Sequence, residues 1–214
     1  MTLLVALLAC LLPILALALL PFATPAHRRT VATAGALGSV SLGASVGVAW
    51  VLEPTPAELW LGPLSFLLDR TAATILPAME TACLAVVLAA PRAELDGRLL
   101  PGALALLAAG QGALLAGNVA TILLFEAATA AVLLLVFSRR RGARTLAWIL
   151  GGALAAELLI PLAAPGLALS PWSAWEPGFG SSRLIAPVVL LGVLARLAIV
   201  PFGSWASAAS SSQR

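Results

Sequence analysis

Hydrophobic residues in this chain gather into seven long runs, and short segments between them carry most of the polar and charged residues. A helix needs about 20 apolar residues to cross a bilayer. The pattern therefore predicts an all-α, polytopic membrane protein with seven transmembrane helices. The predicted spans are 2–22, 30–52, 71–91, 101–117, 119–137, 145–165 and 184–202. We expect residues 1–205 to form a single membrane domain and residues 206–214 to be a polar tail.

Composition supports this class. The chain is 61% hydrophobic and 10% charged, whereas a soluble domain has about 25% charged residues. A net charge of +3 says little about nucleic acid, and for a membrane protein we expect lipid as a partner and no nucleic acid. Cys10 and Cys83 lie in predicted spans and do not predict a disulfide.

Arginine predicts the orientation, because positive residues concentrate in cytoplasmic loops. Every basic residue apart from His27 is an arginine. With seven spans, nine arginines fall on one face: Arg28, Arg29, Arg92, Arg98, Arg139, Arg140, Arg141, Arg144 and Arg214. Only Arg70 and Arg183 fall on the other. We expect a multi-pass protein of the bacterial inner membrane, with the N-terminus outside, the C-terminus in the cytoplasm, and residues 53–70 and 166–183 as outer loops.

Four charged residues fall within predicted spans: Glu80, Glu126, Glu157 and Arg196. Charges are costly there and usually face a protein interior, a partner or a wet path. Glu80 and Glu157 each fit a relay site or a protonated carboxyl bonded to a neighbouring helix. Glu126 and Arg196 suggest an intramembrane pair, which is either part of an ion path or a fixed salt bridge.

Three further features accompany these charges. Asn118 lies before Glu126 on the same side of its helix and is a candidate for the same path. Pro201 follows Arg196 and predicts a helix break, and broken helices near a charge recur in ion transporters. Gly43-x-x-x-Gly47 predicts close helix packing. The sequence contains no Gly-rich phosphate loop, CxxC pair or metal-spaced His cluster, so we expect no catalytic residue, metal or cofactor.

Three stretches resemble one known family. They are Gly62 to Asp69 (GPLSFLLD), Asn118 to Glu126 (NVATILLFE) and Ala195 to Trp205 (ARLAIVPFGSW). Their order is similar to that in the N-terminal half of the antiporter-like subunits of respiratory complex I, a family that includes Mrp-type antiporter, membrane-hydrogenase and inorganic-carbon accumulation subunits. The first resembles an extended segment before the third helix. The others resemble the fifth and seventh helices, which carry a glutamate and a lysine of a proton path.

The resemblance implies that Glu126 matches the glutamate and Arg196 matches the lysine. Arginine stays charged where a buried lysine can lose its proton, so conduction by this chain is doubtful. The sequence also ends after the seventh predicted span, whereas the family has a second repeat. We therefore expect other membrane subunits of a hetero-oligomeric complex to supply the missing helices.

Two functions remain open. One is a subunit of a complex I-like or antiporter-like ion-translocating assembly. The other is a non-conducting accessory or scaffold subunit of a larger bioenergetic complex. Whether the assembly is an NADH:quinone oxidoreductase-like enzyme is open, since this chain shows no chemistry of its own.

Labelling of single cysteines introduced into the loops tests the predicted orientation. We expect a cysteine in residues 53–70 to react from outside and one in residues 139–144 to react only from the cytoplasm. An even number of spans, or both termini on one face, would contradict the arginine distribution.

Overall fold

The structure is a computed structural model. It describes residues 1–90, 99–137, 148, 150–152, 154–155, 158 and 169–171. The chain divides into two compact units, Met1–Gly117 and Asn118–Arg214. The described residues are mostly helical, and four helices are long and apolar enough to cross a membrane: Thr2–Phe22, Ala26–Leu52, Arg70–Ala89 and Val119–Val136. The sixth and seventh predicted spans fall largely outside the described residues.

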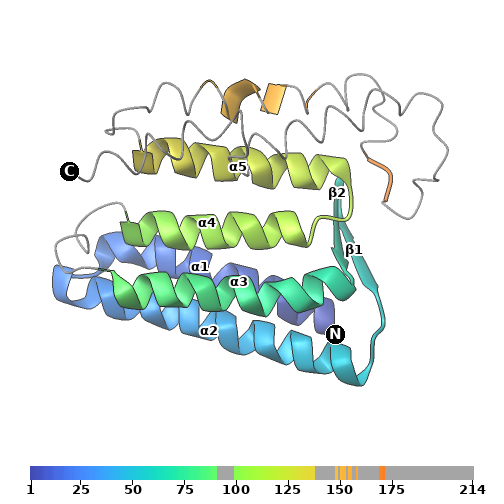
Figure 1. Cartoon of the computed structure of the whole chain (residues 1–214), viewed down its shortest axis with the longest axis horizontal. Helices are drawn as coiled ribbons and strands as arrows, with labels where there is room; N and C mark the ends of the chain where they lie inside the picture. Colours follow the sequence, from blue (N-terminus) through green and yellow to red (C-terminus); the bar gives the residue numbers. More distant parts are fainter. Residues whose placement is uncertain are drawn as a thin grey trace. The chain divides into compact units, whose positions relative to one another are not determined.

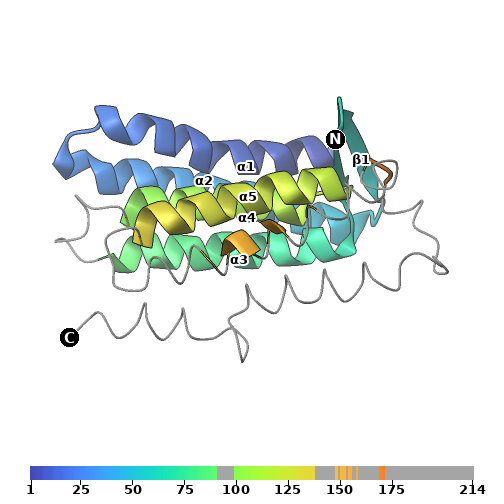
Figure 2. The same ribbon diagram turned by 90° about the horizontal axis from the view of Figure 1, so that it is seen from above.

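The first unit is a bundle of four helices with a β-hairpin at one end (Figure 1). The helices are α1 (Thr2–Leu19), α2 (Pro25–Leu52), α3 (Arg70–Ala89) and α4 (Leu99–Leu114), and a 3₁₀ turn, η1 (Leu20–Phe22), follows α1. Each helix packs against the next, and α4 packs back against α1, which closes the bundle. Figure 2 shows α1 and α2 side by side. A closed bundle of this kind gives its helices an interior that is shielded from the surroundings.

Small residues let α1 and α2 approach closely. A Cβ at Gly35 would overlap the Cβ of Ala16, and a Cβ at Gly38 would lie 2.9 Å from Cδ1 of Leu12. Between apolar helices in lipid, van der Waals packing of this kind replaces the hydrophobic effect as the main attraction.

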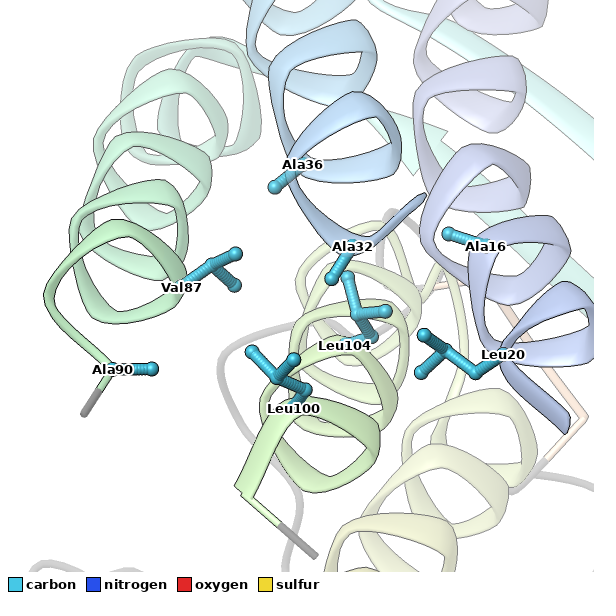
Figure 3. Close-up of a cluster of buried hydrophobic side chains, with 8 residues drawn as sticks. All are labelled: Ala16, Leu20, Ala32, Ala36, Val87, Ala90, Leu100 and Leu104. Carbon is cyan, nitrogen blue, oxygen red and sulfur yellow. The ribbon is translucent and has the colours of Figure 1, made fainter. Parts of the chain in front are cut away.

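Leucine and alanine fill the bundle at the end away from the hairpin. Their side chains converge from all four helices (Figure 3). The cluster consists of Ala16, Leu20, Ala32, Ala36, Val87, Ala90, Leu100 and Leu104. At the same end, Arg29 Nη2 donates to the carbonyl oxygen of Leu88 in the last turn of α3, where helical carbonyls otherwise lack a partner.

The second predicted span begins earlier than the sequence suggested. α2 starts at Pro25 rather than at residue 30 and includes Arg28 and Arg29 in its first turns. Proline at the first helical position is preorganised for a helix start because its φ is fixed. The two arginines therefore belong to α2 and not to a loop that precedes it.

Residues 53–70, which we expected to be a loop in an all-α fold, contain an antiparallel hairpin. Strand β1 (Ala57–Leu61) pairs with β2 (Leu64–Leu68), with Leu61 opposite Leu64. Gly62 has a φ of +63°, and Pro63 has a negative φ by its ring. A positive φ at the first turn residue followed by a negative φ at the second is typical of a type II′ turn, which favours tightly paired strands.

The hairpin is attached to the end of α4, which ends at Leu114 rather than continuing to residue 117 as predicted. The Leu67 N–H donates to the Leu115 carbonyl, and the Gly117 N–H donates to the Ser65 carbonyl, both at 2.7 Å. A Cβ at Gly117 would overlap Oγ of Ser65. These bonds to β2 take residues 115–117 out of the helix.

The second unit begins with α5 (Val119–Phe137), which agrees with the fifth predicted span. Asn118 directly precedes this helix. Ala130 and Leu150 are buried together, with Leu133, Leu134 and Leu154 packed around them. The single domain of residues 1–205 and the tail of residues 206–214 stay predictions.

Gly62→Ala tests the turn. A left-handed backbone conformation costs a non-glycine residue roughly 1–2 kcal/mol, so we expect a lower midpoint of thermal unfolding in detergent. Gly47→Ala is the control, since the added Cβ would be 3.5 Å from Pro77 Cγ, an ordinary contact. Equal midpoints for the two variants would contradict the assigned turn.

Candidate functional site: a buried polar cluster in the first unit

Three polar side chains from three helices meet inside the first unit. Ser39 comes from α2, Glu80 from α3 and Gln111 from α4, and each is 0% exposed. We call these three residues the polar cluster. Glu80 lies ten residues after the start of α3, which is about 15 Å along the helix axis. The cluster therefore lies near the middle of the length of α3.

Hydrogen bonds join the three side chains. Gln111 Nε2 donates to Glu80 Oε1 at 2.7 Å and to Ser39 Oγ at 2.9 Å. The Ser39 hydroxyl lies 3.0 Å from both Glu80 Oε1 and the carbonyl oxygen of Ala9 in α1. Since a hydroxyl carries one hydrogen, Ser39 shares it between these two acceptors. The network reaches all four helices of the bundle.

Two buried oxygen atoms remain without a hydrogen bond among the described residues. They are Glu80 Oε2 and Gln111 Oε1. The described part of the chain also gives Glu80 no basic side chain as a partner. A buried acceptor without a donor costs about 1–3 kcal/mol. Glu80 and Gln111 therefore each lack one hydrogen-bond donor among the described residues.

Glycine creates the space for the carboxyl group. A Cβ at Gly43, one turn after Ser39 in α2, would overlap Oε2 of Glu80 and lie 2.8 Å from Oε1. Gly47 has a different neighbourhood, since its Cβ would make ordinary contacts with Pro77 and Ala73. Thus Gly47 is a packing position, as the sequence suggested for both glycines, whereas Gly43 accommodates a polar group.

Pro77 shapes the same helix without breaking it. α3 runs through Pro77 to Ala89, although proline removes the bond to the carbonyl four residues earlier, that of Ala73. The Ala73 oxygen would be 3.6 Å from a Cβ at Gly47. The Pro77 carbonyl accepts a bond from Thr81 Oγ1 at 2.7 Å.

The other residues predicted for an ion path divide into two groups. Asn118 is buried and caps α5, because its Oδ1 accepts bonds from Thr121 N at 2.9 Å and Thr121 Oγ1 at 2.7 Å. Glu126 is half-buried within α5. Glu157, Arg196 and Pro201 lie outside the described residues, so the Glu126–Arg196 pair stays a prediction.

Sequence reasoning singled out Glu80 but missed Ser39 and Gln111. A signal was present, since Ser39 and Gln111 are polar residues inside apolar spans, and Ser39 precedes Gly43 by one helical turn.

No family model matches the chain, and no curated protein matches it either.

Gly43→Ala should disrupt the polar cluster, because the methyl group takes the place of Oε2. Forcing extra volume into a packed interior costs typically 1–3 kcal/mol. We expect a lower unfolding midpoint in detergent than for Gly47→Ala, which adds the same methyl group one turn away. If Gly43→Ala in a Glu80→Ala background is as destabilising as in the natural chain, the methyl group does not act through Glu80.

Proposed function

We propose that the chain is a membrane subunit of a complex I-like or antiporter-like ion-translocating assembly. The observation that carries the proposal is the order of elements along the chain. β2 and Asp69 lead directly into α3, the third helix, and Asn118 leads into α5, the fifth helix, which contains Glu126. Two of the three stretches on which the family resemblance rests thus occur next to the elements that the resemblance requires.

Asp69 illustrates the agreement at atomic level. Its Oδ1 accepts a hydrogen bond from the Ala72 N–H at 2.7 Å, so it caps α3 in the way expected for an acidic residue at a helix start. An extended strand followed by a capping aspartate gives a physical reason for the stretch GPLSFLLD.

Exposed apolar surface supports a role as a subunit. Along one side of α1, Leu4, Leu8, Leu11 and Leu15 are between 47% and 57% exposed. Lipid or neighbouring membrane chains of a hetero-oligomeric complex would cover such a surface. The proposed location is the bacterial inner membrane, with the hairpin on the outer side.

An accessory or scaffold subunit is the second candidate. The absence of lysine from the chain favours it, because Arg196 cannot release a proton as the family's lysine does. The polar cluster is also compatible with a static role, since its hydrogen bonds hold four helices together.

Glu126→Gln separates the two functions when ion flux is measured in membrane vesicles that contain the natural assembly. If Glu126 relays protons, flux should be abolished while assembly in mild detergent is retained, and Arg196→Lys should keep or raise the flux. Glu53→Gln, the same change at an exposed site, is the control. Normal assembly with unchanged flux in Glu126→Gln would leave the accessory function.

A structural pair gives a different result. Removing one partner of a buried ion pair costs roughly 3–5 kcal/mol, so Glu126→Gln and Arg196→Ala should each lower the yield of the complex. The double variant should lose less than the sum of the two. Additive losses would show that the two residues do not interact.

A further inference from the structure

The two unsatisfied oxygens of the polar cluster belong to side chains that are already bonded to each other. Gln111 Nε2 donates to Glu80 Oε1, while Gln111 Oε1 and Glu80 Oε2 are the atoms left without a donor among the described residues. A carboxylic acid and a primary amide have complementary groups for two bonds, N–H to the acid's carbonyl oxygen and O–H to the amide oxygen. The structure contains the first bond, and the second needs a proton on Glu80 Oε2.

We propose that Ser39, Glu80 and Gln111 form a binding site for one exchangeable proton, held on Glu80 Oε2 and donated to Gln111 Oε1. Loading forms one O–H bond with a proton from water, and release is the reverse step, with no redox change. The site is separate from the predicted Glu126–Arg196 pair, and the proposal does not depend on the assembly to which the chain belongs.

With this proton in place, every donor in the cluster has an acceptor. The two hydrogens of Gln111 Nε2 go to Glu80 Oε1 and Ser39 Oγ, and the Ser39 hydroxyl donates to the Ala9 carbonyl. With an ionised Glu80, the charged Oε2 and the Gln111 oxygen both remain without a donor. Turning the Gln111 amide over would place its oxygen about 2.7 Å from Glu80 Oε1, where an ionised carboxyl has no hydrogen to donate. The hydrogen-bond inventory therefore favours the loaded form.

The surroundings of Oε2 also suit a neutral group. This oxygen lies against Gly43, whose missing side chain provides the space. The first unit offers Glu80 no basic partner among its described residues, and buried charges need one. Amide and hydroxyl partners, by contrast, satisfy a neutral acid.

Infrared spectroscopy of the purified full-length chain in lipid tests the proposal. We expect a carbonyl band of a protonated carboxylic acid that moves to lower frequency in D₂O, because an exchangeable proton is replaced by deuterium. Glu80→Gln should remove this band, and Glu126→Gln, the matched change in α5, should retain it. A band of equal size in Glu80→Gln, or the loss of a carboxylate band instead, would overturn the assignment. If the band that depends on Glu80 does not shift in D₂O, the proton on Glu80 is not exchangeable and the proposal is wrong.

Gln111→Leu provides a readout that leaves Glu80 in place. Without the amide, the acid loses its two hydrogen bonds to Gln111, so its carbonyl band should move to higher frequency than in the natural chain. An unchanged band would rule out the acid–amide pair. Replacing choline by sodium at equal ionic strength should leave the natural band unchanged, and its loss in sodium would show that a metal cation displaces the proton.

Because the infrared spectra do not require ion flux, they test the proton site independently of the proposed transport function. A chain that shows the band but carries no flux has a proton site in an accessory subunit. A chain that supports Glu126-dependent flux without the band carries ions by a route that excludes Glu80.

Discussion

A carboxyl group in the middle of an apolar bundle, with no charged partner in the part of the chain that the structure describes, is the constraint on which the first unit depends. Glu80 must be satisfied by neutral groups among the described residues, and these come from α2 and α4, with the Ala9 carbonyl of α1 one hydrogen bond further away. Since each partner is on a different helix, satisfying one side chain fixes the positions of all four. Leucine and alanine contacts permit many rotations of a helix about its axis, whereas the cluster permits one. Gly43 is part of the same constraint, because the carboxyl fits only where α2 has no side chain.

The hairpin applies a second constraint at the end of the bundle. Its strand β2 bonds to the segment that follows α4 and leads through the Asp69 cap into α3. The two helices that carry Glu80 and Gln111 are therefore connected through backbone hydrogen bonds as well as through the cluster. A backbone connection of this kind keeps the helices from sliding along their axes, and the cluster limits their rotation. Together they hold the amide and the carboxyl within hydrogen-bond distance.

Among the described residues, the sequence predicted the helices at residues 2–22 and 119–137 because hydrophobic length is a strong signal. It did not locate the start of α2, since Arg28 and Arg29 look like a loop although they continue a helix. The hairpin was missed despite the Gly62-Pro63 turn, because apolar strands such as LSFLL have no alternation that distinguishes them from other apolar segments. Glu80 could be chosen from its charge alone. Ser39 and Gln111 could not be joined to it, because the rotation of each helix in the bundle depends on contacts between residues far apart in the chain.

The two membrane carboxyls for which the structure gives a position have different requirements. Glu80 has an amide and a hydroxyl as partners, which complete their hydrogen bonds when the carboxyl carries a proton. Glu126 has a predicted partner, Arg196, that stays charged. An enzyme or transporter that moves protons needs groups whose environments favour opposite protonation states, and an arginine cannot itself be one of the exchanging groups. Since an arginine cannot exchange its proton, the proton site that we propose lies on a carboxyl, Glu80, which an amide and a hydroxyl already hold by hydrogen bonds.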